Sequence, residues 1–438
     1  MAPPTTGTAA FAYRDFRRYQ LARVMVIMGA EAQAVAVAWQ VYEITHRAID
    51  LGYTGLVLFL PGLLFLLPAG HVADRYDRRQ VILVCYVLQI LCTLTLLIFA
   101  LRGLHRVAPI FAVLFLIGSG RAFSGPASSA LLPHLVSTEH FVNAITWGAT
   151  VFQIANIAGP AVGGLLYTLP IKGGLNGGGF YGGRFYGAPI VFLFTLVTGI
   201  SFVFLIGSLH VRPGRMEHRA ISADVILAGF RYVWKSRLLL GSISLDLFVV
   251  LLGGATALLP IFAHDILRTG PQGLGALRSA PALGALAVSI WLTFRPVLWR
   301  PGVLMFMGVA IYGLATITFG LSRSLPLSLA ALMVVGASDM VSVVIRSSML
   351  QLATPASMRG RVSAVNSLFV GASNELGEFE SGVTAQWWGA VRAVVAGGLG
   401  ALAITGIWST LFPGLRDIAQ LTEESLRQVE EEPSSAKF

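Results

Sequence analysis

Charged residues are scarce in this sequence. Only 12% of its 438 residues are Asp, Glu, Lys or Arg, whereas 55% are hydrophobic. In a typical soluble domain about a quarter of the residues are charged. A chain of this composition cannot cover itself with polar surface, and lipid is therefore the expected solvent for most of the folded protein.

Cysteine is nearly absent as well. Cys85 and Cys92 lie in one apolar run, which excludes a disulfide framework, and no metal-ligand spacing occurs. We interpret both thiols as packing residues. The phosphate-binding pattern G-x-x-x-x-G-K-[ST] is also missing, so we expect no ATP-driven activity within this chain. The sequence predicts neither a metal nor another cofactor.

Long apolar runs, by contrast, fill the sequence. A helix needs about 20 apolar residues to cross a bilayer, while barrel strands would appear as short alternating segments, which we do not find. The first residues lack the cleavage pattern of a signal peptide, so the first span should remain as an anchor. The twelve predicted transmembrane helices lie near 19–44, 52–70, 80–101, 107–131, 141–168, 188–209, 238–263, 272–294, 302–321, 327–350, 361–385 and 391–412.

The basic residues predict the orientation of these spans. The net charge is +10, but Lys and Arg cluster at the ends of apolar runs, which is typical of topology signals rather than of nucleic-acid binding. With both termini placed in the cytoplasm, the inner segments hold about twice as many Lys and Arg as the outer ones. We therefore expect a protein integral to the plasma membrane with both termini cytoplasmic.

The two halves of the chain resemble one another at a shift of 218 residues. The aligned pairs include Asn156 with Asn374, Gly159 with Gly377, Gly164 with Gly382, and Gly118 with Gly336. We predict an all-α polytopic membrane protein with two pseudo-symmetric six-helix bundles, a plan found in many secondary transporters. The predicted parts are an arm (1–18), a first bundle (19–209), a linker (210–236) with a helix near 222–235, a second bundle (237–412) and a cytoplasmic tail (413–438).

The stretch "GHVADRYDRR" (70–79) resembles the loop between spans two and three of the major facilitator superfamily. The matching residues of the pattern G-x-x-x-D-R-x-G-R-R are Gly70, Asp74, Arg75, Arg78 and Arg79. The resemblance implies a conformational lock, in which Asp74 faces a helix N-terminus and the arginines bridge to acids or helix C-termini of the other half. The alternative is that these are only positive-inside charges. Asp77 replaces the second glycine of the pattern, which leaves a tight turn there in doubt.

Two further segments resemble motifs of the same superfamily. In "GRAFSG" (120–125), Arg121 and Gly125 match R-x-x-Q-G, with Ser124 in place of glutamine. In "IANIAGPAVGG" (154–164), four residues match a pattern associated with exporters that work as antiporters; Ala155 replaces its first glycine, and the four are Gly159, Pro160, Gly163 and Gly164. Helix packing without any bearing on transport direction is the alternative. "SNELGEFESG" (373–382) and the first span look like the bacterial branch that contains the enterobactin exporter.

Ionisable residues inside spans are candidates for function because they are costly in lipid. The candidates for a substrate or proton pathway are Glu31, Arg121, Asp246, Asp339 and Arg346. The resemblance implies that spans one, four, seven and ten line a central cavity. The repeat places Arg121 opposite Asp339, and we expect the two to face that cavity. Asp339 and Arg346 are seven residues apart and should share a helix face, about 10 Å apart. For each acid, a structural bond to a neighbouring helix remains the alternative.

Together these features predict a secondary transporter rather than an enzyme. We expect export of a small amphipathic organic molecule, drug- or siderophore-like, from the bacterial cytoplasm by alternating access and proton antiport. The partners would be this substrate, protons and membrane lipid, and the chain should act as a monomer without nucleic acid. Import or uniport of a small metabolite remains an alternative. A membrane-embedded enzyme is more remote, because no histidine forms a metal pair with an acid on a helix.

Overall fold

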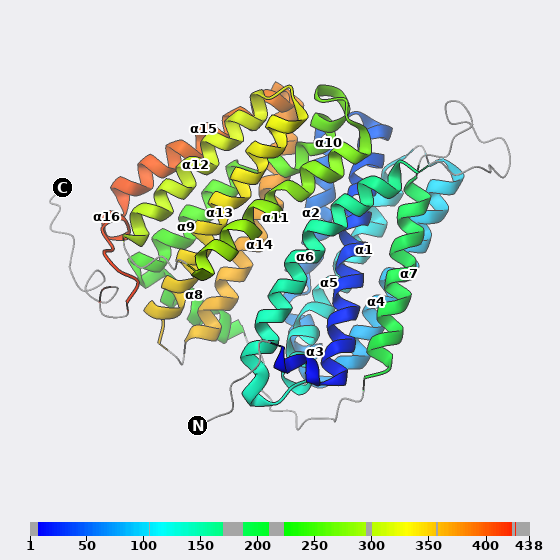
Figure 1. Cartoon of the computed structure of the whole chain (residues 1–438), viewed down its shortest axis with the longest axis horizontal. Helices are drawn as coiled ribbons and strands as arrows, with labels where there is room; N and C mark the ends of the chain where they lie inside the picture. Colours follow the sequence, from blue (N-terminus) through cyan, green and yellow to red (C-terminus); the bar gives the residue numbers. More distant parts are fainter. Residues whose placement is uncertain are drawn as a thin grey trace. The chain divides into compact units, whose positions relative to one another are not determined.

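The computed structural model describes residues 8–104, 106–169, 187–209, 223–294, 300–355, 358–422 and 425. Within these ranges the chain is helical, without a β-strand, which confirms the predicted all-α class. The first half of the chain contains α1 (Arg14–Thr45), α2 (Ala48–Leu64), α3 (Leu66–Arg75), α4 (Arg78–Arg102), α5 (Ala108–Leu131), α6 (Phe141–Tyr167) and α7 (Ala188–Gly207). Figure 1 shows α1 and α4–α7 as neighbours, and α1 packs against both α6 and α7.

The second half begins with α8, which coincides with the helix predicted near 222–235. Its helices are α8 (Ala223–Lys235), α9 (Arg237–Leu252), α10 (Leu259–Ile261), α11 (Gly270–Phe294), α12 (Pro301–Leu321), α13 (Leu325–Ala353), α14 (Arg359–Trp388), α15 (Ala390–Leu411) and α16 (Pro413–Arg416). Short 3₁₀ turns η1 (Ala9–Ala12), η2 (Leu132–His134), η3 (Thr138–His140) and η4 (Ala255–Leu258) and a π-turn η5 (Phe262–Ile266) complete the described elements. Every predicted span falls on one or more of these helical segments.

Ten helical segments in the described ranges are long and apolar enough to cross a membrane by length and composition. The second and the eleventh predicted spans do not meet these criteria of length and composition, and the structure shows why. α2 has only 17 residues, because the second span breaks at Phe65 and continues as α3. Pro68 lies in the first turn of α3, and it cannot bond to the carbonyl four residues earlier. α14 carries three glutamates, Glu375, Glu378 and Glu380.

The seventh span is also interrupted. α9 ends at Leu252, and Gly253 and Gly254 separate it from η4, α10 and η5. Glycine is among the poorest helix formers, so two in succession favour a break at this point. The sequence predicted a continuous helix over 238–263, and the structure corrects this.

The described chain forms two compact units that do not follow the midpoint of the sequence. Unit 1 comprises 1–46, 57–221 and 269–279, and unit 2 comprises 47–56, 222–268 and 280–438. The start of α2 thus belongs to unit 2, and the start of α11 belongs to unit 1. The predicted linker and tail extend beyond the described residues at 210–222, 423–424 and 426–438.

Glycines matched by the 218-residue repeat have equivalent neighbours in the two units. Gly159 of α6 lies against Met28 of α1, and Gly377 of α14 lies against Val250 of α9. In the same way, Gly118 and Gly336 seat α5 and α13 against the carbonyls of Leu58 and Pro281, on α2 and α11. Close crossings of this kind require residues without a side chain. The two bundles are therefore pseudo-symmetric, as predicted.

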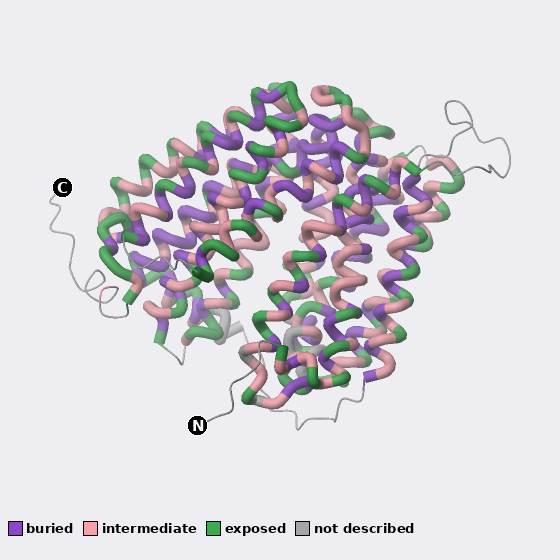
Figure 2. The backbone as a smooth tube through the Cα atoms, viewed as in Figure 1, coloured by how far each residue is buried: buried purple, intermediate pink, exposed green. Residues whose placement is uncertain are grey.

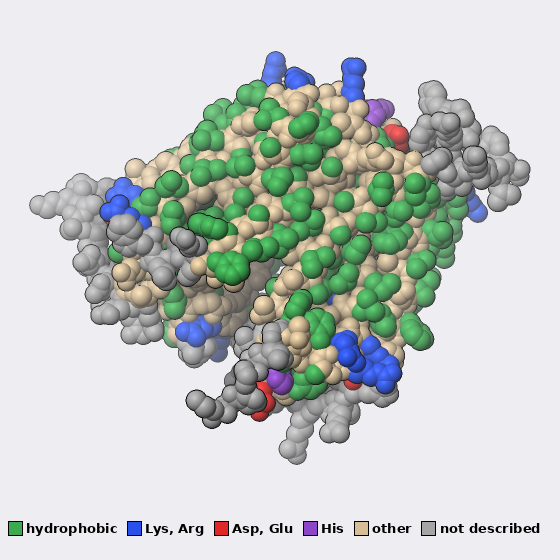
Figure 3. Space-filling view, in the orientation of Figure 1, with side chains coloured by type: hydrophobic (Ala, Val, Ile, Leu, Met, Phe, Trp, Pro, Cys, Tyr) green, Lys and Arg blue, Asp and Glu red, His purple; other side chains and the backbone are tan. Residues whose placement is uncertain are grey.

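The packing of α7 shows how an apolar helix can bury one face in the protein and expose the other. Phe192, Phe202 and Ile206 are buried in unit 1, whereas Leu193 and Phe204 are exposed. A helix that is apolar all round suits burial on one side and lipid on the other. Buried residues lie on the inner sides of the helices (Figure 2), and hydrophobic side chains cover the helix faces in Figure 3, with Lys and Arg at the helix ends.

Candidate functional site

Unit 2 contains a cavity of about 170 Å³ beside the interrupted seventh span. Asp339 on α13 is the charged residue of its lining, and Tyr312 and Thr316 of α12 and Asn374 of α14 supply further polar groups. Gly336 lets α13 approach α11 closely, because a Cβ there would lie 2.6 Å from Pro281 Cα. The cavity is large enough for several water molecules, and its few polar groups lie in an otherwise largely apolar lining.

An ion pair joins Asp246 on α9 to Arg346 on α13. The side chains are 10% and 6% exposed, so each charge depends on the other for compensation. Asp339 forms no ion pair among the described residues and interacts with both charges only at longer range. On α9 and α13, unit 2 thus combines one neutralised pair with the separate carboxylate of Asp339.

Sequence reasoning named both members of this pair but did not pair them. The available signal was depth: Asp246 lies nine residues after the start of α9 at Arg237, and Arg346 lies seven residues before the end of α13 at Ala353. Spans seven and ten run in opposite directions, which places the two at a similar level. The sequence analysis instead related Arg346 to Asp339, because the two share a face of one helix.

Unit 1 contains a smaller cavity, of about 30 Å³, among α1, α4, α5 and α7. Its charged lining residue is Arg121, which is exposed. Gln89 of α4 lies beside it because Gly120 allows a close approach; a Cβ at Gly120 would be 3.3 Å from Gln89 Cγ. Glu31 is half-buried on α1, and its Cβ packs toward Gly159 of α6. Arg121 and Asp339, which the sequence repeat aligns, each line the cavity of their own unit.

The predicted lock stretch is more helical than a loop. Gly70, which is buried, and Arg75, which is exposed, belong to α3, and only Tyr76 and Asp77 separate α3 from α4. The side chain of Asp74 lies outside the described residues. Arg78 contacts His134 Nε2 at 2.6 Å, within unit 1.

Asp77, the departure from the motif, caps the N-terminus of α4. Its Oδ1 accepts hydrogen bonds from the backbone N–H of Arg79 at 2.8 Å and of Gln80 at 3.4 Å. Its φ is −57°, a value that any L-residue adopts. Glycine is therefore not required here, and the aspartate contributes a cap of a kind usually worth about 1 kcal/mol.

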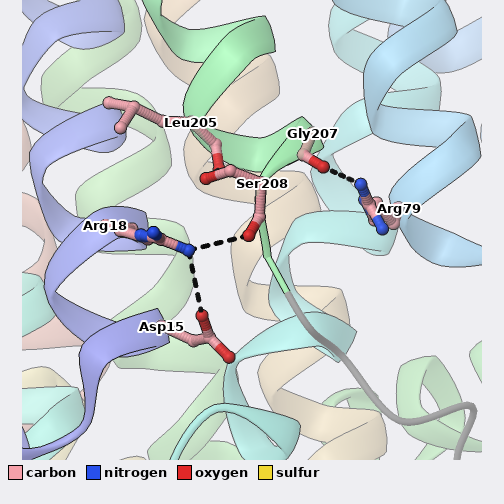
Figure 4. Close-up of polar contacts among 6 residues, drawn as sticks. All are labelled: Asp15, Arg18, Arg79, Leu205, Gly207 and Ser208. Atoms are coloured by element: carbon pink, nitrogen blue, oxygen red, sulfur yellow. Dashed lines mark hydrogen bonds and ion pairs between the residues drawn. The ribbon is translucent and has the colours of Figure 1, made fainter.

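Arg79 and Arg18 cap the C-terminus of α7 (Figure 4). Arg79 donates to the carbonyl of Gly207, and Arg18 donates to the carbonyl of Ser208 at 2.8 Å while pairing with Asp15 at 3.8 Å. Cations stabilise the negative end of a helix. The resemblance implied a contact of Arg79 with the other half of the chain, whereas its described contact is with a helix C-terminus of its own unit.

The small residues of α6 form two close crossings within unit 1. A Cβ at Gly163 would lie 2.6 Å from Ala32 Cα of α1, and one at Gly164 would lie 2.9 Å from Gly275 Cα of α11. The carbonyl of Pro160 faces Gly275 at the second crossing, 2.5 Å from the position of its Cβ. Substitution by larger residues would force these helices apart.

Glu375 and Glu378 of α14 face the start of α2 within unit 2. A Cβ at Gly55 would be 2.9 Å from Glu375 Oε2 and 2.6 Å from Glu378 Oε2, and Glu378 also accepts from Thr256 Oγ1 at 3.5 Å. Among the described residues, no group of three His, Cys, Asp or Glu side chains could hold a metal. The described contacts of these two glutamates are thus polar contacts within unit 2.

Comparisons with known proteins agree with this architecture. The family of transmembrane secretion effectors of the major facilitator type matches residues 5–437. The chain is 28% identical over 394 residues to "Enterobactin exporter" of Escherichia coli O1:K1, covering 88% of this chain and 85% of that protein.

Two solved structures share the fold at low identity. A bacterial homologue of the lysosomal transporter Spinster, inward-facing and occupied, has a TM-score of 0.69 at 15% identity over 92% of this chain and 98% of that chain. A bacterial homologue of the iron transporter ferroportin, inward-facing, has a TM-score of 0.65 at 16% identity over 91% and 99%. The family match over nearly the whole length and the shared fold lead to one assignment: this chain is an integral membrane transporter, not an enzyme, and it belongs to the transmembrane secretion effector family of the major facilitator superfamily.

Proposed function

We propose that this protein exports a small amphipathic organic molecule of the siderophore type across the bacterial inner membrane. The observation that carries the proposal is the relationship to "Enterobactin exporter", which extends over 88% of the chain. The exporter-associated motif of α6 adds support, because Gly163 and Gly164 make the close helix crossings for which such a motif is suited. Alternating access would carry the substrate outward as the bundles 19–209 and 237–412 rock about a central site.

Proton antiport is the proposed energy source, and Asp339 is the proposed proton carrier. A carrier must bind and release a proton during each cycle, which a carboxylate held in an ion pair does poorly. Asp246 is paired with Arg346, whereas Asp339 lines a cavity and has no ion-pair partner among the described residues. Glu31 of α1 is a second candidate, because it is half-buried and forms no ion pair among the described residues.

The proposed orientation places both termini and residues 70–79 in the cytoplasm. Arg75 at the end of α3 and Arg78 and Arg79 at the start of α4 then lie at the inner ends of their spans, as the positive-inside rule predicts. In this arrangement Gly70, Asp74, Arg75, Arg78 and Arg79 form the proposed lock. The contacts of Arg78 with His134 and of Arg79 with Gly207 hold part of this stretch against the rest of unit 1.

Everted membrane vesicles with an acidic interior test the direction and the coupling together. An exporter driven by protons should accumulate labelled enterobactin inside such vesicles, and collapse of the pH gradient should release it. Asp339→Asn should abolish accumulation, whereas Asp417→Asn, a change in an exposed acid outside the spans, should leave it intact. Accumulation by Asp339→Asn at the normal rate would remove this residue from the proton pathway. Accumulation only in right-side-out vesicles would favour the import alternative.

A further inference from the structure

We propose that Arg121 and Gln89 form a subsite in unit 1 for an acidic oxygen of the transported molecule, a carboxylate or a phenolate. The inference deepens the proposed function, and it rests on that function only in taking the bound molecule to be the transported one. Its basis is an uncompensated cation next to a buried hydrogen-bond donor that has no partner within the described structure.

Arg121 lies inside a span, and no ion-pair partner for it is found among the described residues. Among the residues that the structure describes, the Arg121 guanidinium makes neither an ion pair nor a hydrogen bond, in contrast to Arg346 of unit 2. An arginine at membrane depth is costly unless it meets water, an acid or a ligand. Glu31 does not line this cavity, and its Cβ packs toward α6. The guanidinium is thus available to an anion from outside the chain.

Gln89 supplies the second, independent feature. Its Nε2 atom is buried and has no hydrogen-bond partner among the described residues, although the side chain lines the same cavity as Arg121. A buried amide donor without a partner is destabilising, so a site that contains one is suited to an acceptor. Gln33 is already engaged, because it accepts from Thr93 Oγ1 at 2.9 Å.

The size of the cavity limits what can enter it. About 30 Å³ accommodates roughly two water-sized atoms, which fits the oxygens of an acid group but not a whole organic molecule. The body of the ligand must therefore remain outside, on the exposed side of Arg121. Arginine presents several N–H donors in a planar fork and binds carboxylates through paired hydrogen bonds.

Two neighbouring groups extend the positive and aromatic character of this subsite. Arg23 of α1 lies with its guanidinium carbon 5.9 Å from the centre of the Tyr19 ring. Tyr86 lines the cavity and packs against Phe202 with ring centres 3.9 Å apart. Both Arg23 and Arg121 are close enough to act electrostatically on Tyr86. A negatively charged group therefore fits the subsite better than a neutral one.

Equilibrium binding to the purified full-length protein in detergent tests the proposal without any transport. The probe is salicylate, an aromatic acid, and its neutral counterpart is salicylamide. We expect the wild type to bind salicylate at least tenfold more tightly than salicylamide. Arg121→Gln should weaken salicylate binding roughly tenfold to a hundredfold, the usual effect of losing hydrogen bonds to a charged group. Arg121→Lys should retain part of the preference, and Arg102→Gln, a control at the exposed end of α4, should retain all of it.

Gln89→Met separates a binding role from a structural one. Removal of an unpartnered buried amide should leave the melting temperature unchanged or raise it, while the affinity for salicylate falls. A fall in both would indicate a structural role and overturn the assignment of Gln89. Equal binding of salicylate and salicylamide, undetectable salicylate binding, or full affinity in Arg121→Gln would each overturn the subsite. These results concern binding alone, so they are distinguishable from a failure of the vesicle assay.

Discussion

Breaking the Asp246–Arg346 pair should destabilise unit 2 more than any single surface change. In Asp246→Asn, the Arg346 side chain, only 6% exposed, would keep its charge without compensation. Loss of one partner from a buried pair typically costs about 3–5 kcal/mol, and an isolated arginine at the centre of a membrane helix costs at least about 2.5 kcal/mol. A domain of roughly 150–250 residues loses about 2–4 °C of melting temperature per kcal/mol. We therefore expect a drop on the order of 10 °C.

The double variant Asp246→Leu/Arg346→Met supplies the decisive comparison. Replacement of a buried pair by apolar residues of similar volume is often neutral or stabilising, so the double variant should recover most of the loss. Thermal unfolding of detergent-purified protein, followed by size-exclusion chromatography, measures Asp246→Asn, the double variant and a control. Asp417→Asn is the matched control, because its pair with Arg416 at 2.9 Å is exposed, and we expect no measurable shift.

Two outcomes would refute the reasoning about this pair. If Asp246→Asn melts with the wild type, the charge on Arg346 is compensated by something other than Asp246. If the double variant is no more stable than Asp246→Asn, removal of the Arg346 charge does not relieve the loss, and the proposed coupling of the two side chains is wrong.

Three further changes test other parts of the structure. Gly163→Ala should destabilise the protein by about 1–3 kcal/mol through overpacking, because the new Cβ would lie 2.6 Å from Ala32 Cα. Gly125→Ala is the control, because its Cβ would meet nothing within 4 Å. Equal melting temperatures of the two variants would contradict a close crossing of α6 and α1. Asp77→Ala should cost about 1 kcal/mol in unfolding free energy through loss of the α4 cap, with Asp77→Asn near the wild type as the check. In intact cells, an impermeant thiol reagent should label Arg106→Cys but not Arg75→Cys, and the reverse pattern would invert the proposed orientation.

The fold was predictable because hydrophobic length is a strong signal. Each of the twelve apolar runs falls on helical segments, and the 218-residue repeat identified glycines that take equivalent places, such as Gly159 and Gly377. The breaks were less accessible, since hydropathy treats Pro68 and the Gly253–Gly254 pair as ordinary members of apolar runs. Local backbone chemistry, rather than overall apolarity, decides where such a helix is interrupted.

The charged residues of the candidate site could be named from the sequence, but their partners could not. Charge inside a span indicated Asp246, Asp339 and Arg346 as important, but only packing decides which acid meets the arginine. Gln89 was missed because an amide in an apolar run carries no charge signal. Its significance depends on its burial next to Arg121. This proximity is set by how α4 and α5 are rotated against each other, which the sequence does not specify.

The interruption of the seventh span has a mechanical consequence. Gly253 and Gly254 already break the helical hydrogen-bond ladder, and Tyr312 donates to the carbonyl of Gly253 at 3.1 Å. The stretch from Ala255 to Ile266 can therefore change its slope at this point without rupturing further helical bonds. The Asp246–Arg346 contact fixes the other part of the span. A tilt of this kind would alter the wall of the cavity around Asp339 while the rest of α9 stays in place.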